Sequence, residues 1–271
     1  LTDRVGVLLT AAGILACSGL LGRLLLALVR ADRSLTTLEK LVFSFGTGLN
    51  AVSLYVLCVG LAGGLGQRWL FVTPAVIVIA AAAALWGKTW LHRIAVCGSR
   101  IADWKSSLFS REPTATASAP INVADSAATS ISSRWLWLAG PFVLVTLLAA
   151  LLPPVDFDVR EYHLQAPKEF YEQGRITFVP HNIYANMPLG SEMLSLLAMV
   201  VMGDWWYGAL AGKTVIAAAS PLTALALLAA GKRFFSTTAG VVAALVYISI
   251  PWIAQVSTSG LIEGMSALFM F

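Results

Sequence analysis

Two apolar runs without a charged residue, Leu41 to Leu65 and Trp69 to Trp86, constrain the fold more than any other feature of this sequence. A helix of about 20 apolar residues, rising about 1.5 Å per residue, is long enough to cross the hydrocarbon core of a bilayer. Over the whole chain, 58% of residues are hydrophobic and 12% are charged, whereas an ordinary soluble domain has about 25% charged residues. The sequence therefore predicts an integral membrane protein built from helices.

Further apolar runs extend this pattern along the chain. They cover residues 5–29, 135–155, 187–202, 214–231, 234–256 and 261–271. We therefore predict an all-α integral membrane fold, a polytopic bundle of transmembrane helices. The end of the sequence cuts off the last run, and on this basis we expect the chain to be the N-terminal part of a longer protein.

Composition divides the chain into three regions. Residues 1–91 hold three apolar runs and predict an N-terminal three-helix membrane region. Residues 92–134 are rich in small polar residues with little pattern, which is typical of a flexible linker. Residues 135–271 predict a second membrane module, which a polar loop at 156–187 interrupts.

Basic residues predict the orientation, because lysine and arginine are enriched in the cytoplasmic loops of membrane proteins. One predicted side carries nine lysines and arginines: Arg30, Arg33, Lys40, Lys88, Arg93, Arg100, Lys105, Arg111 and Arg134. The other side carries five: Arg4, Arg68, Arg160, Lys168 and Arg175. This distribution places the linker in the cytoplasm and the loop 156–187 on the outer side of the membrane.

The orientation after the loop depends on Lys213 and on the Lys232–Arg233 pair, which flank one apolar run. If that run crosses the membrane once, the two cannot both be cytoplasmic. We favour a cytoplasmic Lys232–Arg233, which makes residues 187–202 re-entrant or interfacial and puts Glu263 outside. Lys213 is then expected to be an interfacial anchor whose ammonium group reaches toward water.

Charge and cysteine content exclude other classes of protein. The net charge of +4 is spread along the chain without a dense basic block, so we expect no nucleic-acid partner. The three cysteines, Cys17, Cys58 and Cys97, have neither metal-ligand nor disulfide spacing. The bilayer itself is the partner that the composition requires.

Acidic residues collect in the segment between Pro153 and Pro188 and just after it. Of the 14 acidic residues in the chain, six lie between Asp156 and Glu192. Pro153 and Pro154 end the preceding apolar helix, because a proline ring cannot continue helical hydrogen bonding. Polar chemistry in this chain is therefore expected here.

Two short juxtamembrane helices are predicted within the loop. Asp158 suits the N-cap of a helix that starts at Val159. Pro167 suits the first turn of a second helix, and Gly174 its end. On the second helix, Phe170 and Tyr171 are expected to dip into the membrane interface, with Glu169 and Glu172 facing water.

These helices would hold several chemically useful groups near the lipid headgroups. Carboxylates such as Asp156 and Asp158 act as general bases or bind a divalent cation, the one cofactor that the loop admits. The cationic candidates for contact with a phosphate are His163, Lys168 and Arg175. The alternative is a solvated loop whose charges only keep it out of the bilayer, with Asp158 as a helix cap and nothing more.

The stretch from Asp156 to Leu164, with Pro167 and Lys168, resembles the first outer loop of the GT-C superfamily of polytopic glycosyltransferases. It is most similar to the bacterial branch of RgtA/B/C/D-like lipopolysaccharide-core transferases, and aminoarabinose transferases and protein O-mannosyltransferases share the plan. That plan is one span, then an outer loop with an aspartate and a tyrosine four residues later, as in Asp158 and Tyr162. The resemblance covers about residues 135–271.

The resemblance implies a function and a set of site residues. The donor would be a sugar on a polyprenyl phosphate, and the acceptor a glycan, lipid or protein at the outer face of a bacterial cytoplasmic membrane. Asp158 would be the general base, with Asp156 orienting it or holding a metal together with it. Substrate contacts would come from Tyr162, His163, Lys168, Arg175, Glu192 and Glu263.

Other functions remain open from the sequence. Glu192 lies within an apolar stretch, and carboxylates at membrane depth usually have a function. With Glu263, it would line the pathway of a transporter or channel, which is the alternative function. A catalytically silent membrane scaffold is the third reading. Tyr184, Trp205 and Trp206 suit an interfacial aromatic belt, or a platform for a sugar ring.

Overall fold

The computed structural model describes residues 2–87 and 133–271, and every regular element among them is a helix. The chain is an all-α integral membrane protein, a polytopic helix bundle, as the apolar runs predict. One compact unit contains Leu1–Val78 and Ile131–Phe271, and Ile79–Ser130 form another. The description below concerns the first unit. The linker predicted over 92–134 lies, up to residue 132, outside the described residues.

Four helices in the described residues are long and apolar enough to cross a membrane. They are α1 (Thr2–Leu28), α2 (Thr37–Leu61), the helix Trp69–Gly87 and a 30-residue helix, Trp205–Phe234. The last is assigned as α7 (Trp205–Ala217) followed by α8 (Ala219–Phe234). The first three agree with the predicted runs, whereas the fourth begins nine residues before the predicted Thr214.

Two of the predicted spans differ from the structure. The helix before the loop is a shorter apolar helix, Arg134–Ala150, which ends five residues before the predicted Val155; η2 (Ser133–Ala139) and α4 (Gly140–Ala150) form it. The run 234–256 is a pair of helices, α9 (Thr237–Ser249) and α10 (Pro251–Ser259), bent by 59°. The bend falls at Pro251, which has no N–H to continue the α9 hydrogen bonding.

The segment after the loop forms a short helix, α6 (Glu192–Met202). Its 11 residues rise about 16 Å, about half the hydrocarbon thickness of a bilayer. It ends at Gly203 in the left-handed conformation (φ 67°) and packs against α7. The length of α6 fits a re-entrant or interfacial segment, and the placement of residues 187–202 in the membrane stays a prediction.

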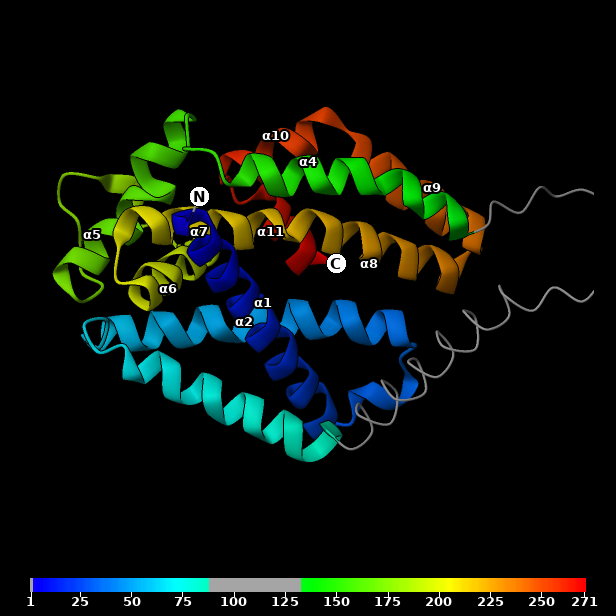
Figure 1. The fold of residues 1–271 in the computed structure, drawn as a ribbon, viewed down its shortest axis with the longest axis horizontal. Helices are drawn as coiled ribbons and strands as arrows, with labels where there is room; N and C mark the ends of the chain where they lie inside the picture. The colour runs from blue at the N-terminus through cyan, green and yellow to red at the C-terminus, as the bar shows by residue number, and fades with distance from the viewer. Residues whose placement is uncertain (1, 88–132) are drawn as a thin grey trace, which may run out of the picture. The chain divides into compact units, whose positions relative to one another are not determined.

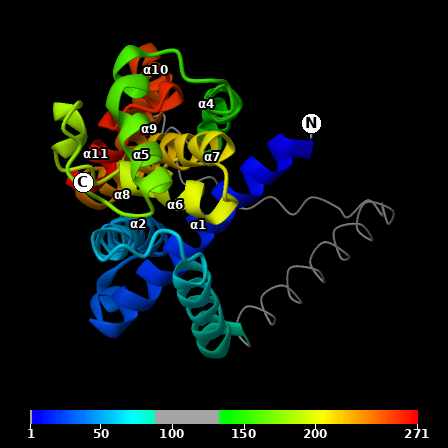
Figure 2. The same cartoon turned by 90° about the vertical axis from the view of Figure 1, so that its left-hand side faces the viewer.

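The compact unit has its most buried helices in the middle (Figures 1 and 2). The helix formed by α7 and α8 is 78% buried over its most apolar window. On one side of it, α1 packs on α7, and α2 packs on α6 and α8. On the other side, α4 and α10 pack on α7, and α9 packs on α8. The short α11 (Glu263–Met270) packs on α8 and also contacts α2.

Helices α1 and α2 approach so closely that their backbones touch. A Cβ added to Gly22 would lie 1.8 Å from the Ser44 carbonyl oxygen, and one added to Gly48 would lie 1.7 Å from that of Ser18. Small residues at such crossings permit van der Waals packing between membrane helices, where no hydrophobic force drives association. Any larger residue at Gly22 or Gly48 would separate the pair.

Two ends of the compact unit carry different polar groups. At one end, Arg233 near the end of α8 contacts Glu39 in the first turn of α2, with 3.0 Å between Nη1 and Oε1. Lys232 and Arg233 therefore lie at the same end as Arg30, Arg33 and Lys40. The loop 153–191 lies toward the opposite end (Figure 1).

The first two helices also support the loop directly. The end of α2 and the turn after it bond to the segment after α5 (Gln165–Gln173): Ile176 N donates to Gly60 O (2.9 Å), and Leu65 N donates to Gly174 O (3.2 Å). Within α2, the Ser53 hydroxyl donates to the Gly190 carbonyl oxygen. The expected division at residue 91 stays a prediction, but α1 and α2 share one hydrophobic core with α6 and α7.

Candidate functional site

Asp156, rather than Asp158, caps the first helical turn of the loop. Its Oδ1 accepts hydrogen bonds from Asp158 N (3.1 Å) and Val159 N (3.5 Å). The Asp158 side chain makes no capping bond and is exposed. The predicted N-cap is therefore wrong by two residues, and the Asp158 carboxylate is left available for other contacts.

The first helix is a widened π turn, η3 (Val159–His163), instead of a regular α-helix. Leu164 N donates to Val159 O, five residues back, at 2.9 Å. Single π turns of this kind occur often at functional sites. Here the turn carries Tyr162 and His163, two of the predicted site residues.

The second helix, α5, has the predicted proline in its first turn and ends at Gly174 (φ 70°) as predicted. The predicted orientation of α5, with Phe170 in the membrane interface and Glu169 facing water, is wrong for both residues. Phe170 is 2% exposed and packs in the protein core, not in a membrane interface. Glu169 is also largely covered, and its Oε1 accepts from Gln165 Nε2 (2.9 Å) and contacts His181 Nε2 (3.2 Å).

Tyr162 lies within electrostatic range of three of the predicted acidic residues. Burial raises the pKa of its phenol, and the nearby carboxylates of Asp158, Glu263 and Glu192 raise it further. Carboxylates have this effect because each disfavours a second negative charge beside it. Three predicted acids that are far apart in the sequence thus act electrostatically on one phenol, and we call Asp158, Tyr162, Glu192 and Glu263 the acidic cluster.

Next to Tyr162, a buried histidine and a buried carboxylate form a tight pair. His163 Nδ1 lies 2.6 Å from Glu192 Oε1, and the two side chains are 6% and 1% exposed. Because a carboxylate only accepts, Nδ1 is the donor. Glu192 Oε2 is buried and has no partner among the described residues. His163 is therefore a partner of Glu192 and not the surface cation predicted to meet a phosphate.

Asn182 connects the π turn to the short helix η4. Its Nδ2 donates to Glu161 O (2.7 Å), and its Oδ1 accepts from Tyr184 N (3.1 Å) and Ala185 N (3.3 Å). These bonds fix η4 (Ile183–Asn186), which stacks Tyr184 on Tyr162 with ring centroids 5.1 Å apart. Tyr184 thus packs against Tyr162 of the acidic cluster. The sequence suggests other roles for it, in an interfacial aromatic belt or as a platform for a sugar ring.

Lys213 lies inside the fold, although the sequence predicts that it is an anchor at the membrane interface. It is 1% exposed, and its Nζ donates to Leu152 O at 2.7 Å. Arg4 Nη1 donates to the neighbouring Leu151 O at 2.6 Å. Cations at a helix C-terminus satisfy carbonyl groups that lack intrahelical partners. Lys213 and Arg4 therefore fix the point where α4 ends and the loop begins.

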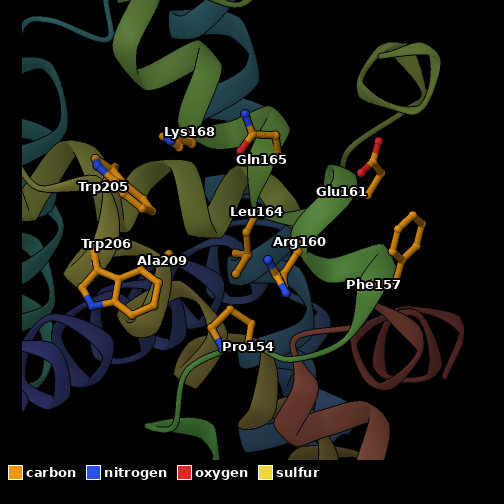
Figure 3. Close-up of a pocket in the computed structure, with 10 residues that line it drawn as sticks. All are labelled: Pro154, Phe157, Arg160, Glu161, Leu164, Gln165, Lys168, Trp205, Trp206 and Ala209. Carbon is orange, nitrogen blue, oxygen red and sulfur yellow. The ribbon is translucent and has the colours of Figure 1, made fainter. Parts of the chain in front are cut away.

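A cavity of about 570 Å³ opens on the other face of the loop helices (Figure 3). Its cationic wall contains Arg160 and Lys168, and its aromatic wall contains Trp205 and Trp206 at the start of α7. The Lys168 ammonium lies 4.2 Å from the centre of a Trp205 ring. The remaining lining residues are Pro154, Phe157, Glu161, Leu164, Gln165 and Ala209.

The predicted phosphate contacts are thus separated from one another. Lys168 lines the cavity, while His163 is buried against Glu192. Arg175 is exposed just after α5, beside Gly63 of the turn that follows α2, and does not line the cavity. Among residues 2–87 and 133–271, no three His, Cys, Asp or Glu side chains group closely enough to hold a metal ion. Metal binding by Asp156 and Asp158 stays a prediction.

Sequence reasoning passed over Arg160 and Asn182. Arg160, Leu164 and Lys168 are spaced by four residues, which would place them on one helix face, and this spacing was the available signal for the cavity. Asn182 precedes a short helical turn, the usual place for a capping side chain. Nothing in the sequence signals its second bond, to the carbonyl group of Glu161.

No family model, curated protein or solved structure matches this chain.

Proposed function

We propose that the protein is a membrane glycosyltransferase that moves a sugar from a polyprenyl-phosphate donor to an acceptor hydroxyl at the outer face of the membrane. The observation that carries the proposal is the acidic cluster: Asp158, free of capping duty, shares the surroundings of Tyr162 with Glu192 and Glu263. A donor with a lipid tail requires a site at the membrane surface, and the loop with its flanking apolar helices suits that requirement.

The proposed reaction needs a base and a means of supporting the departing phosphate. Asp158 takes the proton of the acceptor hydroxyl, whose oxygen then attacks the anomeric carbon. The bond from that carbon to the phosphate oxygen breaks, and the electron pair leaves with the lipid phosphate. Direct displacement of this kind inverts the anomeric centre and needs no covalent enzyme intermediate. A divalent cation near Asp158 would support the same step, and so would Lys168.

The test is transfer of a labelled sugar from a polyprenyl-phosphate sugar by the full-length protein in proteoliposomes. We expect Asp158→Asn to reduce transfer at least about 100-fold, the usual contribution of a general base. Asp32→Asn is the matched control, because Asp32 pairs with Arg23 away from the loop. Undiminished transfer by a well-expressed Asp158→Asn protein would remove Asp158 from the mechanism.

A transporter is the second candidate, and one observation favours it. Helices α9 and α10 form a bent pair of the kind that lines substrate pathways in transporters. Glu192 and Lys213, both buried, are the ionisable residues that such a pathway would use. Substrate flux into proteoliposomes that survives Asp158→Asn, with no sugar transfer by the wild type, would favour this function.

A further inference from the structure

The cavity on the other face of the loop helices has the features of a site for an anion at the membrane surface. Two of its lining side chains, Arg160 and Lys168, are cations, and Glu161 is its one carboxylate. In Figure 3 the Glu161 side chain lies near Phe157 at one edge, away from Trp205 and Trp206. The cationic and aromatic walls therefore face the same space without a carboxylate between them.

Arg160 has no salt bridge or side-chain hydrogen bond within the described part of the chain. Lys168 has only a 3.9 Å ion pair with Glu172, which is half exposed, and its contact with Trp205. A guanidinium presents several donors in a fixed fork that fits phosphate oxygens in pairs, and an ammonium adds a point charge. These two cations are thus available to a ligand instead of being consumed by the fold.

The position of the cavity indicates where its ligand comes from. Trp205 and Trp206 begin the 30-residue helix Trp205–Phe234, and tryptophans are enriched where membrane helices meet the headgroup layer. Pro154, Leu164 and Ala209 give the cavity an apolar floor between these walls. A ligand with a phosphate and an attached lipid chain meets both kinds of surface at once.

We propose that this cavity binds the phosphate of a membrane lipid, with Arg160 and Lys168 on the phosphate oxygens and Trp205 and Trp206 against the adjoining part of the lipid. Phospholipid headgroups and polyprenyl phosphates share this chemistry. The volume of about 570 Å³ falls within the range of about 300–1,000 Å³ usual for small-molecule sites. The identification of the lipid with the sugar donor rests on the proposed function, whereas the phosphate site does not.

The test measures lipid binding by the purified full-length protein with native mass spectrometry, using three probes. These are dioleoylphosphatidylglycerol, undecaprenyl phosphate and the zwitterionic dioleoylphosphatidylcholine. We expect one of the two anionic lipids to bind at least tenfold more tightly than phosphatidylcholine. The variant Arg160→Gln/Lys168→Gln should lose most of this preference, whereas the control Arg33→Gln, which removes an exposed cation at the opposite end, should keep it.

The outcomes distinguish the sources of the phosphate. Preferential binding of undecaprenyl phosphate, lost in the double variant, supports the site with a donor-type lipid as its ligand. Preferential binding of phosphatidylglycerol, lost in the same variant, supports it with a bilayer phospholipid. The proposal is overturned if the wild type and the double variant bind the anionic lipids equally well. A cooperative thermal unfolding transition in both proteins shows that both are folded. Because no sugar is present, these results do not depend on whether the protein transfers one.

Discussion

Glu39 and Glu192 are both buried carboxylates, at 5% and 1% exposure, but their surroundings satisfy them to different degrees. Glu39 Oε2 accepts from Thr36 N (2.7 Å) and both oxygens accept from Arg233, so the group is fully used. Glu192 has one partner, His163, and an oxygen with none among the described residues. The first carboxylate joins two helix ends, while the second keeps one oxygen without a partner among the described residues.

The strongest way to sharpen this comparison is to remove Asp158, the exposed acid that acts on Tyr162 together with Glu192. Asp158→Asn should lower sugar transfer at least about 100-fold while changing the unfolding temperature very little, because Asp158 makes no capping bond. Transfer assays and thermal unfolding in the same detergent give the two values. A large loss of stability instead would mean that Asp158 has a structural role like that of Glu39.

The matched pair Glu192→Gln and Glu39→Gln tests the comparison itself. Glu192→Gln should lower transfer about tenfold, because it loses a charge-assisted hydrogen bond to His163. Glu39→Gln keeps an acceptor for the Thr36 N–H, and the ion pair that it loses, to a half-exposed Arg233, is worth at most about 1 kcal/mol. Transfer rates measured at equal expression should therefore separate the two variants. Equal losses would break the distinction between the two carboxylates.

Loss of the loop cap should have a smaller, local effect. Asp156→Ala removes the acceptor for two backbone N–H groups and should cost about 1 kcal/mol, which is about a fivefold faster hydrogen exchange for the amides of 157–164. Ser236→Ala removes a comparable cap at the start of α9, where Ser236 Oγ accepts from Ala239 N at 3.1 Å. It should leave the loop amides unchanged and affect 237–240 instead; faster loop exchange in both variants would contradict a local cap.

The smallest expected effect concerns the alkaline titration of Tyr162. Its pKa in the folded protein is raised above the ordinary value of 10.0, so above about pH 10 the unfolded chain loses this proton before the folded protein does. Stability is therefore unaffected by Tyr162 below pH 10 and falls as the pH rises through the folded-state pKa. Unfolding temperatures measured from pH 9 to 11 should fall less for Tyr162→Phe than for the wild type. Parallel curves would show that folding does not raise the pKa of this phenol.

How much of this could be predicted from the sequence depends on the range of the interactions concerned. The helices α1 and α2 follow from apolar runs, and the end of α5 from Gly174, because these signals are local. The short α4 and the bend at Pro251 escape a reading based on hydropathy, which counts apolar residues without testing the backbone. The pairing of His163 with Glu192 and the burial of Lys213 depend on contacts over 29 and 61 residues, which no local pattern encodes.

The candidate site was predicted in part for the same reason. Asp158, Tyr162, Glu192 and Glu263 were expected to form one site, and that grouping stays a prediction, although all three carboxylates raise the pKa of Tyr162. The expected cations, however, were chosen by proximity in sequence, and only Lys168 of the three lines the cavity. The π turn alters the angles at which residues 159–163 leave the backbone, so helical spacing alone does not tell which side each residue faces.

The bonds from the turn after α2 to the segment after α5 bear on how the protein can be divided for study. A polypeptide shortened to begin at residue 135 would keep all the residues of the family resemblance and every member of the acidic cluster. It would lose Gly60, Leu65 and Ser53, and with them the three hydrogen bonds that join these residues to the loop. Expressing the first 91 residues as a separate polypeptide alongside it offers a way to restore that support, as in split membrane proteins that reassemble from fragments.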